Sequence, residues 1–263
     1  MRTLNKLKQI SATIVSSSEL MPGCHLMCVE APDIVAIAKP GQFVTVSCGQ
    51  ELTLRRPLSI HQVANLGQLH LLFGIVGKGT SWLSDHHEGE TLDLLGPLGS
   101  GFSIEQASRN LLLVAGGIGI APLAFLAQQA LSEGKSVTLL LGARTGAGLY
   151  PQRLLPGGIE TVIATEDGST GTKGMITDIL PDFVDWADQI YACGPLAMYQ
   201  RMAIKNQQRH VRKPVQISLE VRMGCGLGAC YGCSIRTRRG MKQVCLDGPV
   251  FNLDEIIWQE VGI

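Results

Sequence analysis

The sequence is poor in aromatic residues and has no excess of charge of either sign. Phenylalanine, tryptophan and tyrosine make up 5% of the 263 residues, and 22 lysines and arginines balance 22 aspartates and glutamates. Proteins that bind nucleic acid or an anionic membrane surface use clustered positive charge, so this balance argues against both kinds of partner. Internal repeats and low-complexity tracts are also missing. From the length alone we expect about two domains.

Long hydrophobic runs are missing as well. Polar residues interrupt the basic stretch 1–18, which therefore lacks the apolar core of a signal peptide. The most apolar later stretch, Leu111–Leu126, contains three glycines and a proline and is too short to span a bilayer. We therefore expect a cytoplasmic protein, and a reducing cytosol suits thiolates that bind metal.

Cysteine and glycine, in contrast, are concentrated near the C-terminus. Four of the eight cysteines lie within Glu220–Asp247 with the spacing C-x4-C-x2-C-x11-C, and the first three follow the plant-type [2Fe–2S] pattern. Two bridged irons need four thiolates, of which three can come from one loop and the fourth from a neighbouring segment. Interleaved glycines allow backbone N–H groups to approach the sulfurs. The predicted ligands are Cys225, Cys230, Cys233 and Cys245.

Three other interpretations of these cysteines compete. A zinc site would more typically show two separated C-x2-C pairs, and only Cys230 and Cys233 form one. Disulfides would need an oxidising compartment. Unrelated buried cysteines would not gather among glycines. The spacing favours the iron–sulfur interpretation, and we expect the arginines at 236, 238 and 239 to form a solvent-facing hairpin tip beside it.

The first hundred residues have the pattern of short strands separated by turns, which is typical of a small antiparallel barrel. Only Thr80–His87 has a helical pattern in this half, and Gly96–Gly99 is expected to be a turn. The expected strands are Gln9–Ser16, His25–Glu30, Phe43–Ser47, Leu58–Val63, Leu69–Val76 and Thr91–Leu95.

After Gly101 strands alternate with helices, which predicts a parallel sheet with helices on both faces. Helices are expected at Pro122–Leu131 and from Pro195 to about Gln208. The C-terminal piece of the chain is too small for a large core of its own, and we expect the iron–sulfur cluster to stabilise its fold. The expected strands are Leu111–Ala115, Ser136–Gly142, Thr161–Thr165, Gln189–Ala192 and Val215–Val221.

A glycine-rich loop follows the first strand of this second half. There the helix N-terminus offers free N–H groups, and nucleotides bind at the carboxyl edge of such sheets. A tight turn that serves only packing is the alternative. Two later strands end in Thr165–Ser169 and in a Cys-Gly-Pro turn, which would line the same edge. The candidate residues are Gly116, Gly117, Ile118 and Gly119, with Cys193, Gly194 and Pro195.

Two weaker candidates lie in the barrel half. Arg56 offers a planar fork for a phosphate, Pro57 stiffens the backbone and Ser59 adds a small donor on a strand. Alone this is weak, because an arginine beside a strand is usually a solvated edge residue. Gly77–Thr80, at the start of a predicted helix, is a second possible phosphate cradle.

Together these motifs resemble the ferredoxin–NADP reductase superfamily. The resemblance rests on RPLS at 56–59, LLFGIVGKGT at 71–80, GPLGSGF at 96–102, GGIGIAPL at 116–123 and CGP at 193–195. The cysteine loop, VCLDGPVF at 244–251 and TEDGSTGTKGMITD at 165–178 narrow it to the electron transfer subunits of the NAD-linked, two-subunit dihydroorotate dehydrogenase B. The resemblance covers essentially the whole chain.

The resemblance implies a fold class, three domains and their cofactors. It implies an antiparallel FAD-binding barrel at 1–102, an α/β NAD(H)-binding domain at 103–213 and a [2Fe–2S] domain at 214–263. NAD(H) would approach the glycine loop and the Cys-Gly-Pro turn, and the four cysteines would ligate the cluster. FAD would contact Arg56, Pro57, Leu58, Ser59, Leu72, Phe73, Gly74, Gly79 and Thr80.

The three implied cofactors differ in the number of electrons that they exchange. Nicotinamide exchanges two electrons as a hydride, a [2Fe–2S] cluster carries one, and a flavin can do both. Such transfer needs positioning rather than a catalytic acid or base, so none is assigned. The three domains leave no room for a site that oxidises dihydroorotate. The resemblance therefore implies an FMN-containing catalytic partner for pyrimidine biosynthesis, as a heterotetramer with two of each subunit.

Two alternatives and one choice stay open at this point. The chain could be the flavin reductase subunit of a cytosolic hydrogenase or of a transhydrogenase-type complex, since a fold does not reveal its partner. It could also be a non-catalytic, metal-stabilised binding module. NAD is favoured over NADP because Glu166 and Asp167 lie near the expected nucleotide edge, although Arg144 also follows a strand there.

Overall fold

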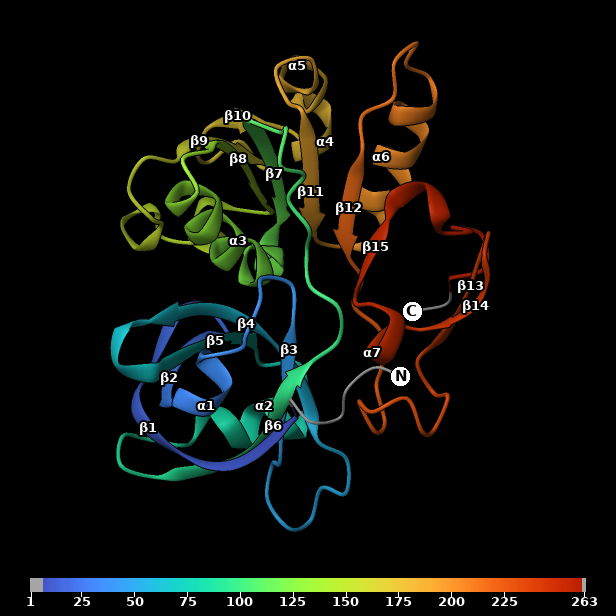
Figure 1. Ribbon diagram of the computed structural model, residues 1–263. Coiled ribbons are helices and arrows are strands. Elements are labelled where there is room, and N and C mark those ends of the chain that lie inside the picture. The colour runs from blue at the N-terminus through green and yellow to red at the C-terminus, as the bar shows by residue number, and fades with distance from the viewer. Residues whose placement is uncertain (1–6, 262–263) are drawn as a thin grey trace.

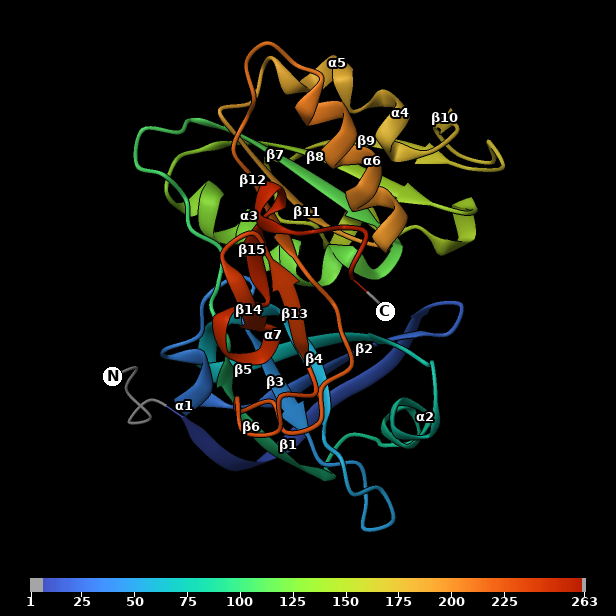
Figure 2. The ribbon, with the colours of Figure 1, turned by 90° about the vertical axis from the view of Figure 1, so that its right-hand side faces the viewer.

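The computed structural model describes residues 7–261. A closed barrel forms one end of the molecule, and a twisted sheet covered by helices forms the other (Figure 1). The C-terminal segment runs along one side of both (Figure 2). Within the described residues, no helix is long and apolar enough to cross a membrane.

The barrel confirms the predicted antiparallel architecture. Its strands follow the order β1-β2-β5-β4-β3-β6 around the barrel. Every second residue of the last strand, from Leu92 to Leu98, is buried, which is the period of a strand with one face in a core. The strands are β1 (Lys8–Met21), β2 (Cys24–Glu30), β3 (Phe43–Val46), β4 (Arg56–Ala64), β5 (Gln68–Gly74) and β6 (Thr91–Leu98).

Two local predictions for the barrel half are wrong. Gly96–Leu98 is the end of β6 and not a turn, and Gly96 pairs with Lys8 of β1. A Cβ atom at Gly96 would lie 2.7 Å from Val44 Cγ1, so this glycine allows two strands to approach closely. The predicted helix is present as α2 (Lys78–Ser84), but the short α1 (Pro32–Val35) was not expected.

The second half is a seven-stranded sheet in the order β10-β9-β8-β7-β11-β12-β15, parallel except for β15. Leu111 and Leu113 of β7 face α3, whereas Leu112 and Val114 face α4, α5 and α6, so helices cover both faces as predicted. The strands are β7 (Asn110–Gly116), β8 (Ser136–Ala143), β9 (Glu160–Thr165), β10 (Thr172–Lys173), β11 (Gln189–Cys193), β12 (Val215–Ser218) and β15 (Val250–Asn252); the helices are α3 (Ile120–Ser132), α4 (Ile176–Ile179), α5 (Pro181–Val184) and α6 (Leu196–Gln207).

The C-terminal segment is built into both halves. Its strands β12 and β15 extend the sheet, whereas β13 (Ser234–Thr237) and β14 (Gly240–Gln243) form a separate two-stranded sheet. The short helix α7 (Val244–Asp247) follows the hairpin. Cys233, Cys245 and Phe251 share one hydrophobic cluster with Phe43 and Leu98 of the barrel. The segment therefore has no separate core, which agrees with the expectation from its size.

Candidate functional site

The first cavity, which we call the barrel cavity, has a volume of about 330 Å³ and opens between the barrel and the sheet. Part of its wall comes from the start of β4 and the end of β5, two segments predicted to hold flavin. The structure brings together Arg56, Pro57, Leu58, Ser59, Leu72, Phe73, Gly74 and Thr80 on this wall.

Gly79 lies next to the barrel cavity and shapes it indirectly. A Cβ atom at this position would lie 2.3 Å from Arg56 Nε, so only glycine lets the guanidinium lie across the first turn of α2. The Thr80 hydroxyl accepts hydrogen bonds from the N–H groups of Val76, at 2.9 Å, and Gly77, at 3.3 Å. The planar cation and this turn form the kind of surface that binds a phosphate.

Sequence reasoning missed a large part of the wall of the barrel cavity. The end of β12 and the chain after it supply residues 218–221, Met223 and Pro249, and α3 supplies Ala121. Residues 218–221 form the end of the predicted strand Val215–Val221, of which only Val215–Ser218 is strand in the structure. The rule that places ligands beyond the carboxyl ends of strands applies to this edge, but it does not indicate that the edge faces the barrel.

Glu220 is the one acidic side chain among the described residues on this wall. Desolvation by the surrounding protein raises the pKa of its carboxyl group, whereas the hydrogen bond with Cys193 lowers it. Cys193 Sγ lies 3.9 Å from Glu220 Oε1, and burial raises the pKa of that thiol as well. The pKa values of both groups therefore lie above those of a carboxyl and a thiol in water.

The second cavity, which we call the nucleotide cavity, has a volume of about 730 Å³ and lies at the carboxyl edge of the sheet. The predicted residues Gly116, Gly117, Ile118 and Pro195 line it. Arg144 and Glu166, which follow neighbouring strands, face the same space. The hairpin between β1 and β2 closes it from the barrel side with Met21, Pro22 and Cys24, which sequence reasoning did not assign. Ile118 lines both cavities, so they adjoin at this residue.

Gly119, Cys193 and Gly194 lie behind the wall of the nucleotide cavity. A Cβ atom on Gly119 would stand 2.0 Å from the Cys193 carbonyl oxygen, and one on Gly194 would stand 3.1 Å from Gly116 Cα. The side chain of Cys193 is fully buried. These residues hold the loop after β7 against the loop after β11, which is the packing role that was the alternative for a glycine-rich turn.

The four predicted cluster ligands lie in one loop and the adjacent α7. Backbone N–H groups of Leu227 and Ala229 each donate to Cys225 Sγ at 3.3 Å. The N–H of Gly228 donates to Cys245 Sγ at 3.2 Å, and that of Cys245 donates to Cys233 Sγ at 3.4 Å. Amides directed at sulfur stabilise thiolates, and they are the contacts that tune an iron–sulfur cluster.

The loop folds in this way because its residues tolerate a left-handed backbone. Gly226 and Gly228 have φ values of +72° and +80°, and the non-glycine Tyr231 has a φ of 59°. Burial would raise the pKa of Cys225, but N–H donors led by Leu227 lower it to about 6. Burial raises the pKa of Cys245 to about 12. The donor set thus fits a cluster held by thiolates, with one ligand already biased to its charged form.

Within residues 7–261 no three His, Cys, Asp or Glu side chains converge on a site for a single ion. A two-iron cluster divides its four thiolates between two metals and does not require such convergence. The loop lies near the surface, because Cys230 and Tyr231 are exposed. The loop also packs on the barrel, since a Cβ atom at Gly226 would lie 3.0 Å from Thr45 Cγ2 of β3 (Figure 2).

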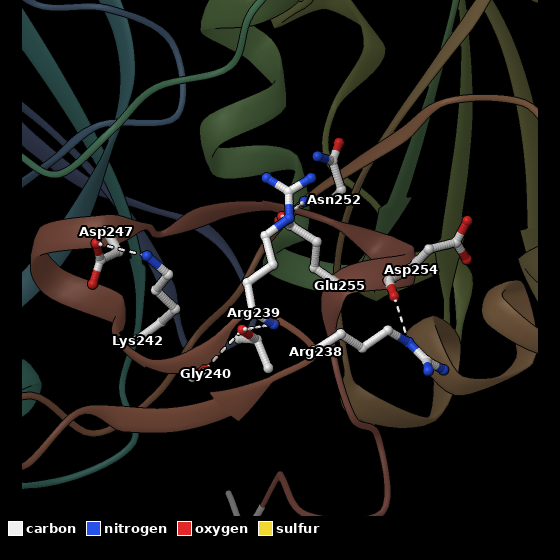
Figure 3. A network of polar contacts seen from close by, with 9 residues as sticks. Arg238, Arg239, Gly240, Lys242, Asp247, Asn252, Asp254 and Glu255 are labelled. Atoms are coloured by element: carbon white, nitrogen blue, oxygen red, sulfur yellow. Dashed lines mark hydrogen bonds and ion pairs between the residues drawn. The ribbon is translucent and has the colours of Figure 1, made fainter.

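The predicted arginine-rich hairpin tip joins β13 to β14 (Figure 3). Arg238 Nε donates to the Asp254 carbonyl oxygen at 2.9 Å, and Arg239 Nε lies 2.9 Å from Glu255 Oε1. The Arg239 side chain is 74% exposed, so this ion pair contributes little to stability. Both arginines nonetheless tie the hairpin to the segment after β15.

Comparisons with known proteins agree with these sites. The family model described as the iron–sulfur cluster binding domain of dihydroorotate dehydrogenase B matches residues 220–257, and that of the oxidoreductase NAD-binding domain matches residues 113–203. The electron transfer subunit of dihydroorotate dehydrogenase B (NAD(+)) from Desulforamulus reducens is 39% identical over 262 residues, covering 96% of this chain and 99% of the relative. Its counterpart from Bacillus caldolyticus is 41% identical over 227 residues, 83% of this chain and 87% of the relative.

Solved structures show the same fold. A chain from the structure of the NADH-dependent reduced ferredoxin-NADP oxidoreductase is 30% identical, with a TM-score of 0.86 over 95% of this chain and 91% of that one. A ferredoxin NADP+ reductase from Neisseria gonorrhoeae, solved with bound FAD and NADP, shares the fold with a TM-score of 0.65 at 16% identity, over 81% of this chain and 99% of that one. Since the curated relatives match along nearly their whole length and the cluster model covers the cysteine loop, the chain belongs to the family of dihydroorotate dehydrogenase B (NAD(+)) electron transfer subunits.

Proposed function

We propose that this chain carries electrons between NAD(H) and an FMN-containing catalytic subunit that converts dihydroorotate to orotate in pyrimidine biosynthesis. In this role it is an NAD-linked iron–sulfur flavoprotein oxidoreductase subunit. Bound FAD would exchange a hydride with nicotinamide and single electrons with a [2Fe–2S] cluster. The continuity of the three sites carries the proposal. The nucleotide and barrel cavities share Ile118, and the chain that lines the barrel cavity at Met223 continues directly into Cys225.

The protein's contribution is to hold and orient these groups. Arg56 and the first turn of α2 would hold the pyrophosphate of FAD, and Leu58 and Phe73 would pack against the flavin. Ile118 separates the two cavities where nicotinamide and flavin would meet. Among the described residues, the wall of the barrel cavity carries one carboxyl group, that of Glu220, and no histidine. Such an arrangement suits transfer by positioning rather than by acid–base catalysis.

The partner would dock on the C-terminal segment, next to the cluster. Four large apolar side chains of the described part of this segment are exposed: Leu227 at 44%, Tyr231 at 70%, Met241 at 65% and Leu246 at 42%. Large apolar residues exposed close to a redox group are expected at a protein interface, where aromatic and methionine side chains are enriched. We further propose two copies of each subunit and a cytoplasmic location, where thiolate ligands stay reduced.

Replacing Tyr231 with glutamate should weaken partner binding by about 10-fold or more, because a charge would then be buried in the interface. Iron and flavin content should stay at the wild-type level, since this side chain points to solvent. The measurement is recovery of the catalytic subunit on a tagged variant. Leu66→Glu, a change at a 93% exposed apolar residue on the barrel, is the matched control. Equal recovery with Tyr231→Glu and wild type would contradict docking at this loop.

The nucleotide is proposed to be NAD. Glu166 lines the nucleotide cavity, and its negative charge would repel the 2′-phosphate of NADP, while Arg144 on the same wall acts in the opposite direction. The Glu166→Lys variant should raise the NADPH to NADH ratio of kcat/KM by about 10- to 100-fold, the range of one charge-assisted contact. Glu160→Lys, at the other end of β9, should leave the ratio unchanged. A wild-type preference for NADPH would refute the assignment.

One observation favours a second candidate. The structural neighbour at 30% identity belongs to an NADH-dependent reduced ferredoxin–NADP oxidoreductase, so a transhydrogenase-type complex is the alternative. Co-purification from the native source separates the two. Recovery of a dihydroorotate-oxidising, FMN-containing subunit supports the proposal, whereas recovery of an NADP-reducing flavoprotein supports the alternative.

A further inference from the structure

A buried histidine links the two cavities from within the barrel. His61 lies on β4, two residues beyond Ser59, and is 0% exposed. Its Nδ1 is 3.0 Å from the Ala121 carbonyl oxygen in the first turn of α3, and its Nε2 is 2.9 Å from the Tyr150 hydroxyl. The imidazole and phenol rings meet edge to face, with centroids 5.3 Å apart. One side chain of the barrel therefore contacts two separate segments of the nucleotide-binding half.

The chemistry of the partners fixes the state of the imidazole. A carbonyl oxygen only accepts, so Nδ1 of His61 must carry the proton and donate to Ala121. Nε2 is then an acceptor, and the Tyr150 hydroxyl donates to it. Burial lowers the pKa of His61 to about 4 despite the opposing bond to Ala121, and burial raises the pKa of Tyr150 to about 12. Both groups are neutral at physiological pH. The hydrogen bond between them therefore persists across this range and does not act as a pH switch.

Each of the two segments that His61 contacts adjoins residues that line the nucleotide cavity. Ala121 lies three residues after Ile118 and itself lines the barrel cavity. Tyr150 directly follows the stretch 144–149, of which Arg144, Thr145, Ala147 and Gly148 line the nucleotide cavity. β4 carries the residues of the barrel cavity from Arg56 to Ser59. A shift of His61 relative to Ala121 or Tyr150 would therefore change the distance between the two cavities.

Helix α3 is fixed on the barrel at a second place, farther from the cavities. It lies between the sheet and the barrel (Figure 1), and Phe125 packs in the hydrophobic cluster of the barrel. Gln128 Nε2 donates to the Val63 carbonyl oxygen of β4 at 2.9 Å. This bond links the same helix to the same strand but does not involve Ala121 or Tyr150. Gln128 is thus a natural control for His61.

We propose that His61 and Tyr150 are positioning residues that set the nicotinamide of NAD(H) against the flavin. The inference rests on the proposed function, because it assumes that a hydride passes between ligands bound in the two cavities. Hydride transfer requires reacting atoms about 3–3.5 Å apart, and a misplacement of about 1 Å can lower a rate by roughly 100-fold. A hydrogen-bonded pair is directional in a way that the surrounding apolar packing is not, which suits this role.

The test compares four forms of the FAD-loaded protein: wild type, Tyr150→Phe, Gln128→Met and the double variant His61→Phe/Tyr150→Phe. In Tyr150→Phe we expect kcat for NADH-driven dye reduction to fall about 10- to 100-fold, with KM for NADH changed by less than about 2-fold. FAD per chain should stay at the wild-type value. Without nucleotide, hydrogen exchange should accelerate in peptides covering 116–124 and 144–150. Gln128→Met should leave kcat and these peptides unchanged.

The double variant separates positioning from stability. Replacing both hydrogen-bonding side chains with apolar rings leaves neither unpaired, and the Ala121 carbonyl keeps its partner within α3, so the unfolding temperature should recover toward wild type. On our proposal kcat does not recover with it. Recovery of both, or an unchanged kcat in Tyr150→Phe, would overturn the inference while leaving the proposed function intact. A wild-type protein that fails to reduce the dye with NADH would contradict both.

Discussion

The Cys230→Ser variant is expected to keep NADH-driven dye reduction near the wild-type rate while electron delivery to the catalytic partner falls by about 100-fold or more. Cys230 is the exposed cysteine of the loop, whereas Cys233 and Cys245 belong to the hydrophobic cluster shared with the barrel. Serine is a poor ligand for iron, so the cluster should be lost. The barrel and nucleotide cavities do not include Cys230, so the flavin should still accept electrons from NADH.

The measurement has three parts: iron per chain, FAD per chain, and the two rates. Cys28→Ser is the control, because Cys28 is a buried cysteine of β2 far from the loop in sequence. It should retain iron, flavin and both rates. A Cys230→Ser protein with full iron content would show that this thiol is not a ligand. Parallel loss of both rates would contradict the separation of the cluster from the flavin site.

The second large effect concerns flavin binding. Arg56→Ala should weaken FAD binding by about 10- to 100-fold, which corresponds to the loss of one or more charge-assisted hydrogen bonds. Arg56 lines the barrel cavity and lies across Gly79 at the start of α2. Alanine would leave this turn without its cation. FAD retained after gel filtration, and titration of FAD into the apoprotein, measure the effect.

The neighbouring Arg55 provides a matched control. It is also an arginine at the end of the same loop, but its Nη2 lies 2.6 Å from Asp93 Oδ2 and it does not line the cavity. Arg55→Ala should bind FAD as the wild type does, because an ion pair of this partly exposed kind contributes little to stability. Equal loss of FAD in both variants would show that the loop, and not the Arg56 side chain, is responsible.

The sequence predicted those features that depend on local pattern. A run such as Leu111–Ala115 is buried on both faces and therefore consists of apolar residues throughout, which identified the parallel sheet. The glycine loop after it and the spacing of the four cysteines are also local signals. For the same reason, most residues assigned to the two cavities from motifs lie on their walls.

Features that depend on tertiary contacts could not be predicted in this way. Residues 218–221 reach the barrel cavity only because β12 joins the sheet beside β11. His61 and Tyr150 are 89 residues apart, and nothing in either segment indicates the other. Gly96 resembled a turn because glycine and proline usually end strands, whereas here the glycine serves close packing against Val44. Each of these outcomes depends on which segments become neighbours.

The central claim is that this chain is half of an enzyme, and the oxidation of dihydroorotate tests it most directly. NAD+ reduction by dihydroorotate should be measured with the cofactor-loaded chain alone and again after adding the catalytic subunit. We expect no turnover by the chain alone, although it reduces a dye with NADH, and NAD+-dependent turnover once the partner is present. Turnover of dihydroorotate by the chain alone, or none with the partner, would contradict this division of labour.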